Sequence, residues 1–184
     1  MGLYLRANKV IFLKRQLSFF LTVLLFNNLF SQNLKLDSFT KGINQTELKN
    51  LLYVYASDFF KGRETGELGQ KRAVEFISEY YESLNIKAAK GIENYFQKMK
   101  LNISGNIVET ENVVSVIEGS EKPNEYIIIS SHLDHEGEKN GVIYNGADDN
   151  GSGTIGVLKI AEAFQNAVLL GFRPKRSIVF LHLT

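Results

Sequence analysis

The chain has 184 residues, carries 21 lysines and arginines against 20 aspartates and glutamates, and contains no cysteine. The lack of cysteine excludes a thiol nucleophile, a cysteine-ligated zinc site and an iron–sulfur cluster. The charge balance is close to neutral and no basic patch remains beyond the N-terminus, so we expect no nucleic-acid partner.

The first 31 residues have the parts of a secretory signal peptide. Four basic residues precede an uncharged apolar run over residues 17–26, two asparagines break the run, and the small residue Ser31 follows. Because a membrane span needs about 20 residues, no stable span is expected, and an uncleaved anchor is the alternative. We predict cleavage of residues 1–31 and export to the periplasm or the extracellular space. Residues 32–184 then keep 17 basic and 20 acidic residues, a net charge of −3.

Residues 32–184 are long enough for one domain, and helical and extended patterns alternate along them. Apolar residues at helical spacing predict a helix over residues 44–55, with Thr46 as its N-cap. A second helix is expected to carry apolar residues between 73 and 84 on one face. Apolar and β-branched runs predict three strands, over residues 94–101, 112–117 and 126–130.

The last third of the chain has the pattern of a strand–helix–strand unit. We expect a loop over residues 132–150, a helix over 154–164 and a continuous apolar strand over 177–181. This order indicates a parallel unit with a right-handed crossover, and it predicts an α/β fold with a mixed, mostly parallel sheet flanked by helices. The strand over 177–181 is expected to leave one edge uncovered, so the chain should self-associate.

A histidine and an aspartate follow the strand over residues 126–130. His132 lies just past the carboxyl end of this strand, where open α/β sheets bind their ligands. Residues i and i+2 of an extended segment point the same way, so Asp134 shares a face with His132. A lone histidine after a strand is usually structural, but a metal-bound imidazole usually donates its other N–H to a carboxylate, so this spacing strengthens the case for a metal ligand severalfold.

A glycine-rich loop over residues 145–153 contains Asp148, Asp149 and Asn150. Capping the following helix needs one such side chain, and three stand here in a row. A carboxylate can also bridge two metal ions through its two oxygens. The loop matches the opening of an EF-hand, but Lys159 stands where the bidentate glutamate belongs, which argues against calcium.

The two clusters together resemble the signature of the co-catalytic di-zinc aminopeptidases. The matching residues are His132-x-Asp134 and Gly146-Ala147-Asp148-Asp149-Asn150-x-Ser152-Gly153. This family is typified by bacterial leucyl aminopeptidases, and its relatives include glutamate carboxypeptidase and glutaminyl cyclase. Segments 58–66 and 112–114 are also similar to the family, and the resemblance covers roughly residues 46–184.

The resemblance implies a zinc exopeptidase-like fold and a site for two Zn²⁺ ions. It assigns His132 to one zinc, makes Asp149 the ligand that bridges both, and gives Asp134 the catalytic task of orienting His132. Asp148 is not expected to be a ligand, and His135 is expected to be a surface or loop residue. His182 lies in an apolar strand, and this position predicts a hydrogen-bonded core histidine.

The family pattern continues beyond the part that this chain matches. In the family, a Glu-Glu pair that supplies the general base and a zinc ligand follows the strand equivalent to residues 177–181, and this chain ends at Thr184, where the pair would begin. We therefore interpret residues 32–184 as the N-terminal part of a peptidase catalytic domain, truncated in its middle strands. The parent is expected to be an exported aminopeptidase that acts on peptides and uses two zinc ions to activate water, and the chain alone is expected to be inactive. The alternatives are a glutaminyl cyclase-like enzyme and a non-catalytic remnant or binding module.

Overall fold

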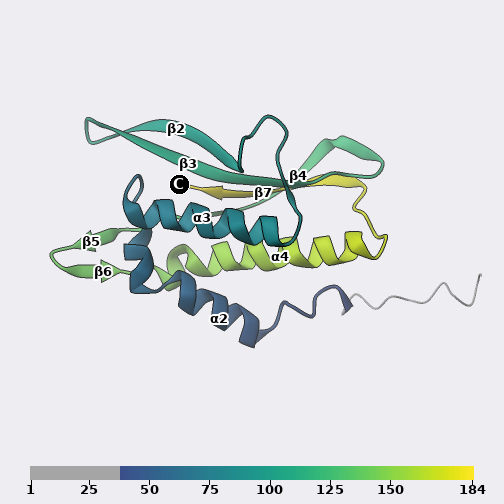
Figure 1. The fold of residues 1–184 in the computed structure, drawn as a ribbon, viewed down its shortest axis with the longest axis horizontal. Helices are drawn as coiled ribbons and strands as arrows, with labels where there is room; N and C mark the ends of the chain where they lie inside the picture. The colour runs from purple at the N-terminus through teal and green to yellow at the C-terminus, as the bar shows by residue number, and fades with distance from the viewer. Residues whose placement is uncertain (1–37) are drawn as a thin grey trace, which may run out of the picture. The chain divides into compact units, whose positions relative to one another are not determined.

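The computed structural model describes residues 38–184, which form helices on one side of a sheet (Figure 1). The predicted leader over residues 1–31 lies outside this part of the chain. Within residues 38–184, no helix combines the length and the apolar character that a membrane crossing requires.

Three α-helices form the helical layer: α2 (Gln45–Tyr55), α3 (Leu68–Ser83) and α4 (Ser152–Leu169), with a short 3₁₀ segment η2 (Asp58–Arg63) between α2 and α3. The N-cap of α2 is Asn44 and not Thr46 as predicted. Asn44 has extended backbone angles, and its side-chain oxygen accepts a hydrogen bond from the N–H of Glu47 at 3.0 Å. This geometry satisfies one of the free N–H groups of the first turn, whereas Thr46 is already inside the helix.

The main sheet has the order β1-β3-β7-β4, with β2 also paired to β3. Its strands are β1 (Lys87–Ala88), β2 (Phe96–Ile103), β3 (Asn106–Ile117), β4 (Lys122–His132) and β7 (Arg176–Leu183). Among the strands within residues 38–184, only β4 and β7 are parallel, and α4 provides the crossover between them. The mixed α/β sheet is therefore confirmed, but within residues 38–184 the expectation of a mostly parallel sheet is wrong. A two-residue turn joins β2 to β3, and so short a connection permits only antiparallel pairing.

The strand β7 lies inside the sheet, with β3 paired antiparallel on one side and β4 parallel on the other. The prediction of an uncovered edge over residues 177–181 is therefore wrong, because β3 folds back beside β7. Among the described strands β4 forms one free edge of the main sheet, and the apolar side chains of Tyr126, Ile127 and Ile128 are exposed there.

Two other sequence predictions need correction. The strand predicted from residue 94 begins at Phe96, because Asn94 and Tyr95 adopt positive φ angles of 50° and 70° in a turn. The predicted loop over residues 132–150 contains a small hairpin, β5 (Gly137–Lys139) with β6 (Val142–Tyr144). Each of its strands has three residues, which is too short for a period-two pattern to stand out.

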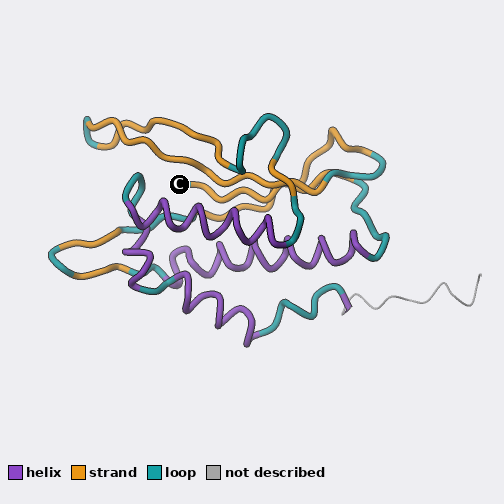
Figure 2. The backbone as a smooth tube through the Cα atoms, in the orientation of Figure 1, coloured by secondary structure: helices purple, strands orange, loops and turns teal. Residues whose placement is uncertain are grey.

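The core lies between the sheet and helices α3 and α4, and α2 packs on α4 from the outside (Figures 1 and 2). Tyr81 of α3 and Phe164 of α4 both contact Phe180 of β7, which is fully buried. The start of α4 lies beside the carboxyl end of β4, where the hydroxyl of Thr154 donates to the carbonyl of His132 at 3.0 Å, and the two candidate ligand segments lie there.

Candidate metal centre

His132 is the last residue of β4 and lies at the carboxyl edge of the parallel strand pair, opposite Leu183 of β7. Its side chain is 42 % exposed, so the ring can reach solvent at this edge. The Nδ1 atom lies 3.2 Å from the backbone carbonyl of Asp134 and 3.4 Å from Oδ1 of the same residue. A carbonyl oxygen can only accept, so Nδ1 is the donor in this contact, and a ring with its single hydrogen on Nδ1 has its lone pair on Nε2.

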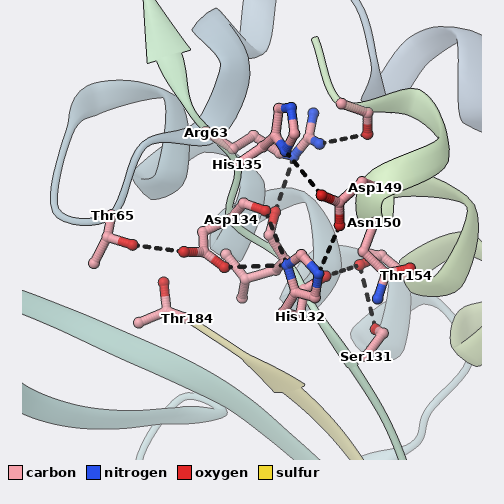
Figure 3. Close-up of polar contacts among 12 residues, drawn as sticks. Arg63, Thr65, Ser131, His132, Asp134, His135, Asp149, Asn150, Thr154 and Thr184 are labelled. Carbon is pink, nitrogen blue, oxygen red and sulfur yellow. Dashed lines mark hydrogen bonds and ion pairs between the residues drawn. The ribbon is translucent and has the colours of Figure 1, made fainter. Parts of the chain in front are cut away.

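Asp149 faces that lone pair, and Figure 3 shows its carboxylate pointing at the ring of His132. Its Oδ1 atom lies 3.0 Å from Nε2 of His132, and its side chain is 73 % exposed. Two acceptors at this distance repel one another unless a proton or a cation lies between them. An imidazole nitrogen and a carboxylate oxygen are both ordinary zinc ligands, so this donor pair fits Zn²⁺.

Thr65 holds the carboxylate of Asp134 on the side that faces away from His132. Its Oδ2 atom accepts a hydrogen bond from the hydroxyl of Thr65 at 2.7 Å, and this contact fixes the carboxylate while Oδ1 faces the histidine. The structure therefore brings together all three residues that the sequence singled out, namely His132, Asp134 and Asp149. The sequence did not identify Thr65 as a site residue. Its position inside the family-like segment over residues 58–66 was the signal that could have identified it.

The three adjacent polar residues of the glycine-rich loop have separate environments. Asn150 caps the first turn of α4, where its side-chain oxygen accepts from the N–H of Gly153 at 3.1 Å. Asp148 is exposed, and Asp149 faces His132. The capping requirement is thus met by Asn150, which leaves Asp149 available for a ligand.

His135 lies in the loop after β4 as predicted, and its side chain is 15 % exposed. Its Nδ1 atom lies 3.9 Å from Oδ2 of Asp149, which places the carboxylate between two imidazole rings (Figure 3). Gly146 permits this approach. It has a φ of 53°, and a Cβ at this position would lie 2.4 Å from the ring of His135.

His182 is fully buried in the core, as predicted. Its Nε2 atom lies 2.7 Å from the hydroxyl of Tyr81, and its Nδ1 atom lies 3.2 Å from that of Ser131. Burial lowers the pKa of His182 from its usual 6.5 to about 3, so the ring is neutral at physiological pH. From Ser131 the contacts continue through the hydroxyl of Thr154, which donates to the carbonyl of His132 at 3.0 Å. The candidate ligand is therefore tied to the core by its backbone.

The described residues bring two candidate ligands together, and no group of three or more histidine, aspartate or glutamate residues within 38–184 is arranged to hold a metal ion. A catalytic zinc normally has three protein ligands and one open position. His132 and Asp149 thus fit a part of such a site.

Comparison with solved structures defines the class of fold. The chain is similar to a glutaminyl cyclase from Macrostomum lignano, with a TM-score of 0.60 and 13% identity over 83% of this chain and 41% of that chain. It is also similar to a Zn-dependent exopeptidase from Parabacteroides distasonis, with a TM-score of 0.54 and 19% identity over 72% of this chain and 45% of that chain. The fold is therefore zinc exopeptidase-like, an α/β fold with a mixed sheet and flanking helices.

The sequence comparisons give a family match over part of the chain. Residues 112–184 match the model of Peptidase family M28. A curated relative, a probable glutamate carboxypeptidase from Arabidopsis thaliana, is 36% identical over 73 residues, which are 40% of this chain and 10% of the relative. The chain thus spans about a tenth of this relative and less than half of the solved structures that it matches.

Proposed function

We propose that this chain carries part of the zinc site of an exported exopeptidase, most simply an aminopeptidase that acts on peptides. One observation carries the proposal: Nε2 of His132 and Oδ1 of Asp149 face each other at 3.0 Å, at the sheet edge where α/β folds bind ligands. The match of residues 112–184 to Peptidase family M28 supports it. Export rests on the predicted signal peptide over residues 1–31.

Each residue of the centre has a separate task in this proposal. His132 and Asp149 hold a zinc ion, and the second oxygen of Asp149 is available to bridge to another. Asp134 would hold a hydrogen on Nδ1 of His132, which directs Nε2 of the ring toward Asp149 as the ligand atom. When bound, zinc supplies Lewis-acid polarisation of a carbonyl and activation of water.

The described part of the chain supplies two candidate ligands, and a catalytic zinc normally needs three. We therefore propose that the 184-residue chain binds at most one zinc ion, weakly, and does not hydrolyse peptides without further residues. Peptide hydrolysis also needs a general base, which contributes roughly 10²–10⁴ in rate. Asp134 is not available for this task, because its two oxygens face His132 and the hydroxyl of Thr65.

The test is a zinc competition titration of the purified chain, with matched pairs of variants. Asp149→Asn and His132→Gln should abolish zinc binding, whereas the neighbouring Asp148→Asn should leave it unchanged. No binding by the unaltered chain, or an equal loss in Asp148→Asn, would contradict the proposal.

Substrates separate the remaining alternatives. We expect no chelator-sensitive turnover of aminoacyl anilides or of glutaminyl peptides by this chain. If the chain turned over an anilide in a zinc-dependent way and His132→Gln removed that activity, further ligands would have to complete the site, and the two-ligand proposal would be wrong. Turnover of a glutaminyl peptide alone would favour the cyclase, and zinc-free binding of a protein partner would favour a binding module.

A further inference from the structure

Arg63 is fully buried, although arginine is among the residues least often found inside proteins. It ends the segment η2, and its φ of 54° is unusual for a residue with a side chain. Its guanidinium carbon lies 4.6 Å from the centre of the Tyr55 ring, which covers one face of the charged group. A strained backbone and a buried charge both cost free energy, so their combination at one residue points to a specific task.

The side chain of Arg63 binds the two loops of the candidate metal centre at once. Nε donates to the carbonyl of Leu133 at 2.9 Å, between His132 and Asp134. Nη1 donates to the carbonyl of Asn145 at 2.8 Å, and Nη2 donates to that of Gly146 at 2.9 Å. These two carbonyls lie four and three residues before Asp149, on the glycine-rich loop.

Two further contacts reinforce the first loop. The hydroxyl of Tyr55 also donates to the carbonyl of Leu133 at 2.9 Å, and the N–H of His135 donates to the carbonyl of Arg63 at 3.2 Å. Nη1 of Arg63 makes a fourth bond, to the carbonyl of Tyr55 at 3.2 Å. The four bonds use most of the five N–H groups of a guanidinium. Arg63 is thus neither exposed nor free to bind a substrate carboxylate.

We propose that Arg63 is a positioning residue, which fixes the loop of His132 and Asp134 relative to the loop of Asp149 so that the two candidate ligands face each other. This inference rests on the proposed zinc site. Without the guanidinium, the carbonyls of Leu133, Asn145 and Gly146 would lose their shared donor. Besides packing, the link that remains between the two ligand segments is the hydrogen bond from the hydroxyl of Thr154, at the start of α4, to the carbonyl of His132.

A lysine cannot replace this contact, because its single nitrogen cannot reach three carbonyls that the planar guanidinium meets along separate N–H directions. Arg63→Lys therefore keeps the positive charge and removes the geometry. Arg72 of α3 provides the matched control, since it also stacks on an aromatic ring, that of Phe59 at 4.4 Å, and donates to the carbonyl of the same residue. It contacts neither ligand loop in these bonds.

The test uses the full chain and two readouts. The first is zinc affinity by competition, which should fall roughly 10- to 100-fold in Arg63→Lys, as is usual when a group that orients a metal ligand is lost. The second is nuclear magnetic resonance of the imidazole nitrogens in the metal-free chain, which has only three histidines. In Arg63→Lys the signals of His132 and His135 should shift, while that of the core His182 should not. Arg72→Lys should change neither readout.

The outcomes separate the positioning role from a general structural one. Unchanged His132 and His135 signals with unchanged zinc affinity overturn the inference, and so does an equal shift of all three histidines, which would mark a global loss of packing. If Arg63→Lys does not fold, Tyr55→Phe removes only the hydroxyl bond to Leu133 and must show the same selective shift in a weaker form. If the unaltered chain binds no zinc, the proposed function fails, and the histidine signals still decide whether Arg63 positions the loops.

Discussion

The buried His182 makes the stability of the chain depend on pH in a calculable way. Burial lowers its pKa from 6.5 to about 3 in the folded protein, where its two ring nitrogens contact Tyr81 and Ser131. Between these two pH values the unfolded chain binds a proton that the folded chain does not bind. The contribution of His182 is therefore fully present above pH 6.5 and is lost as the pH falls toward 3.

The size of this effect follows from the width of the window. Each pH unit between 6.5 and 3 costs about 1.4 kcal/mol of unfolding free energy, so the full window corresponds to on the order of 5 kcal/mol. We expect His182→Gln to be less stable than the unaltered chain at pH 8, because the glutamine fits the two hydroxyls less well. Its stability should fall less steeply between pH 6.5 and 4, because glutamine does not titrate there.

Urea unfolding followed by circular dichroism at several pH values measures both slopes. Other histidines and carboxylates titrate in both proteins, so the difference between the two slopes reports His182 alone. Parallel slopes would refute the reasoning, because they would mean that the folded protein accepts a proton at this buried position.

Four other predictions concern the site, the core, the sheet edge and the leader. Asp134→Asn should weaken zinc binding roughly 10- to 100-fold in a competition titration, because the neutral amide orients His132 less strongly; an unchanged affinity would remove Asp134 from the site. Phe180→Ala should lower the unfolding free energy by about 3–5 kcal/mol, measured by urea unfolding, because Phe180 is fully buried; a loss below 1 kcal/mol, roughly the cost of a surface change, would mean that the core is not packed as described. Ile128→Lys, at a residue 61% exposed on β4, should reduce self-association in size-exclusion chromatography, and an unchanged oligomer would place the contact elsewhere. Secreted material should begin after Ser31 by N-terminal sequencing, and a chain that still begins at Met1 would contradict the signal peptide.

The sequence predicted the candidate ligands because their meeting depends on local rules. His132 ends a strand, Asp149 precedes the helix that crosses back over the sheet, and a parallel strand–helix–strand unit brings such positions to one edge. The roles of Asp134, Asn150 and His182 follow from spacing or from the surrounding apolar pattern, which are also local features.

The contacts of Arg63 could not be predicted in the same way. Its partners in the two ligand loops are backbone carbonyls 70 to 83 residues further along the chain, and a carbonyl leaves no mark in the amino-acid sequence. The position of β7 between β3 and β4 is likewise a matter of long-range pairing. An apolar run over residues 177–181 indicates a buried strand, but it does not name the strands on either side.

The separate environments of Asp148, Asp149 and Asn150 have an evolutionary consequence. Three neighbouring codons should be under three different selective pressures. The exposed Asp148 should accept many polar residues, and Asn150 should exchange with the few side chains that can cap a helix, such as aspartate or serine. Asp149 should tolerate almost no replacement as long as the proposed zinc site is under selection, and its loss in a descendant would mark a lineage in which that site was given up.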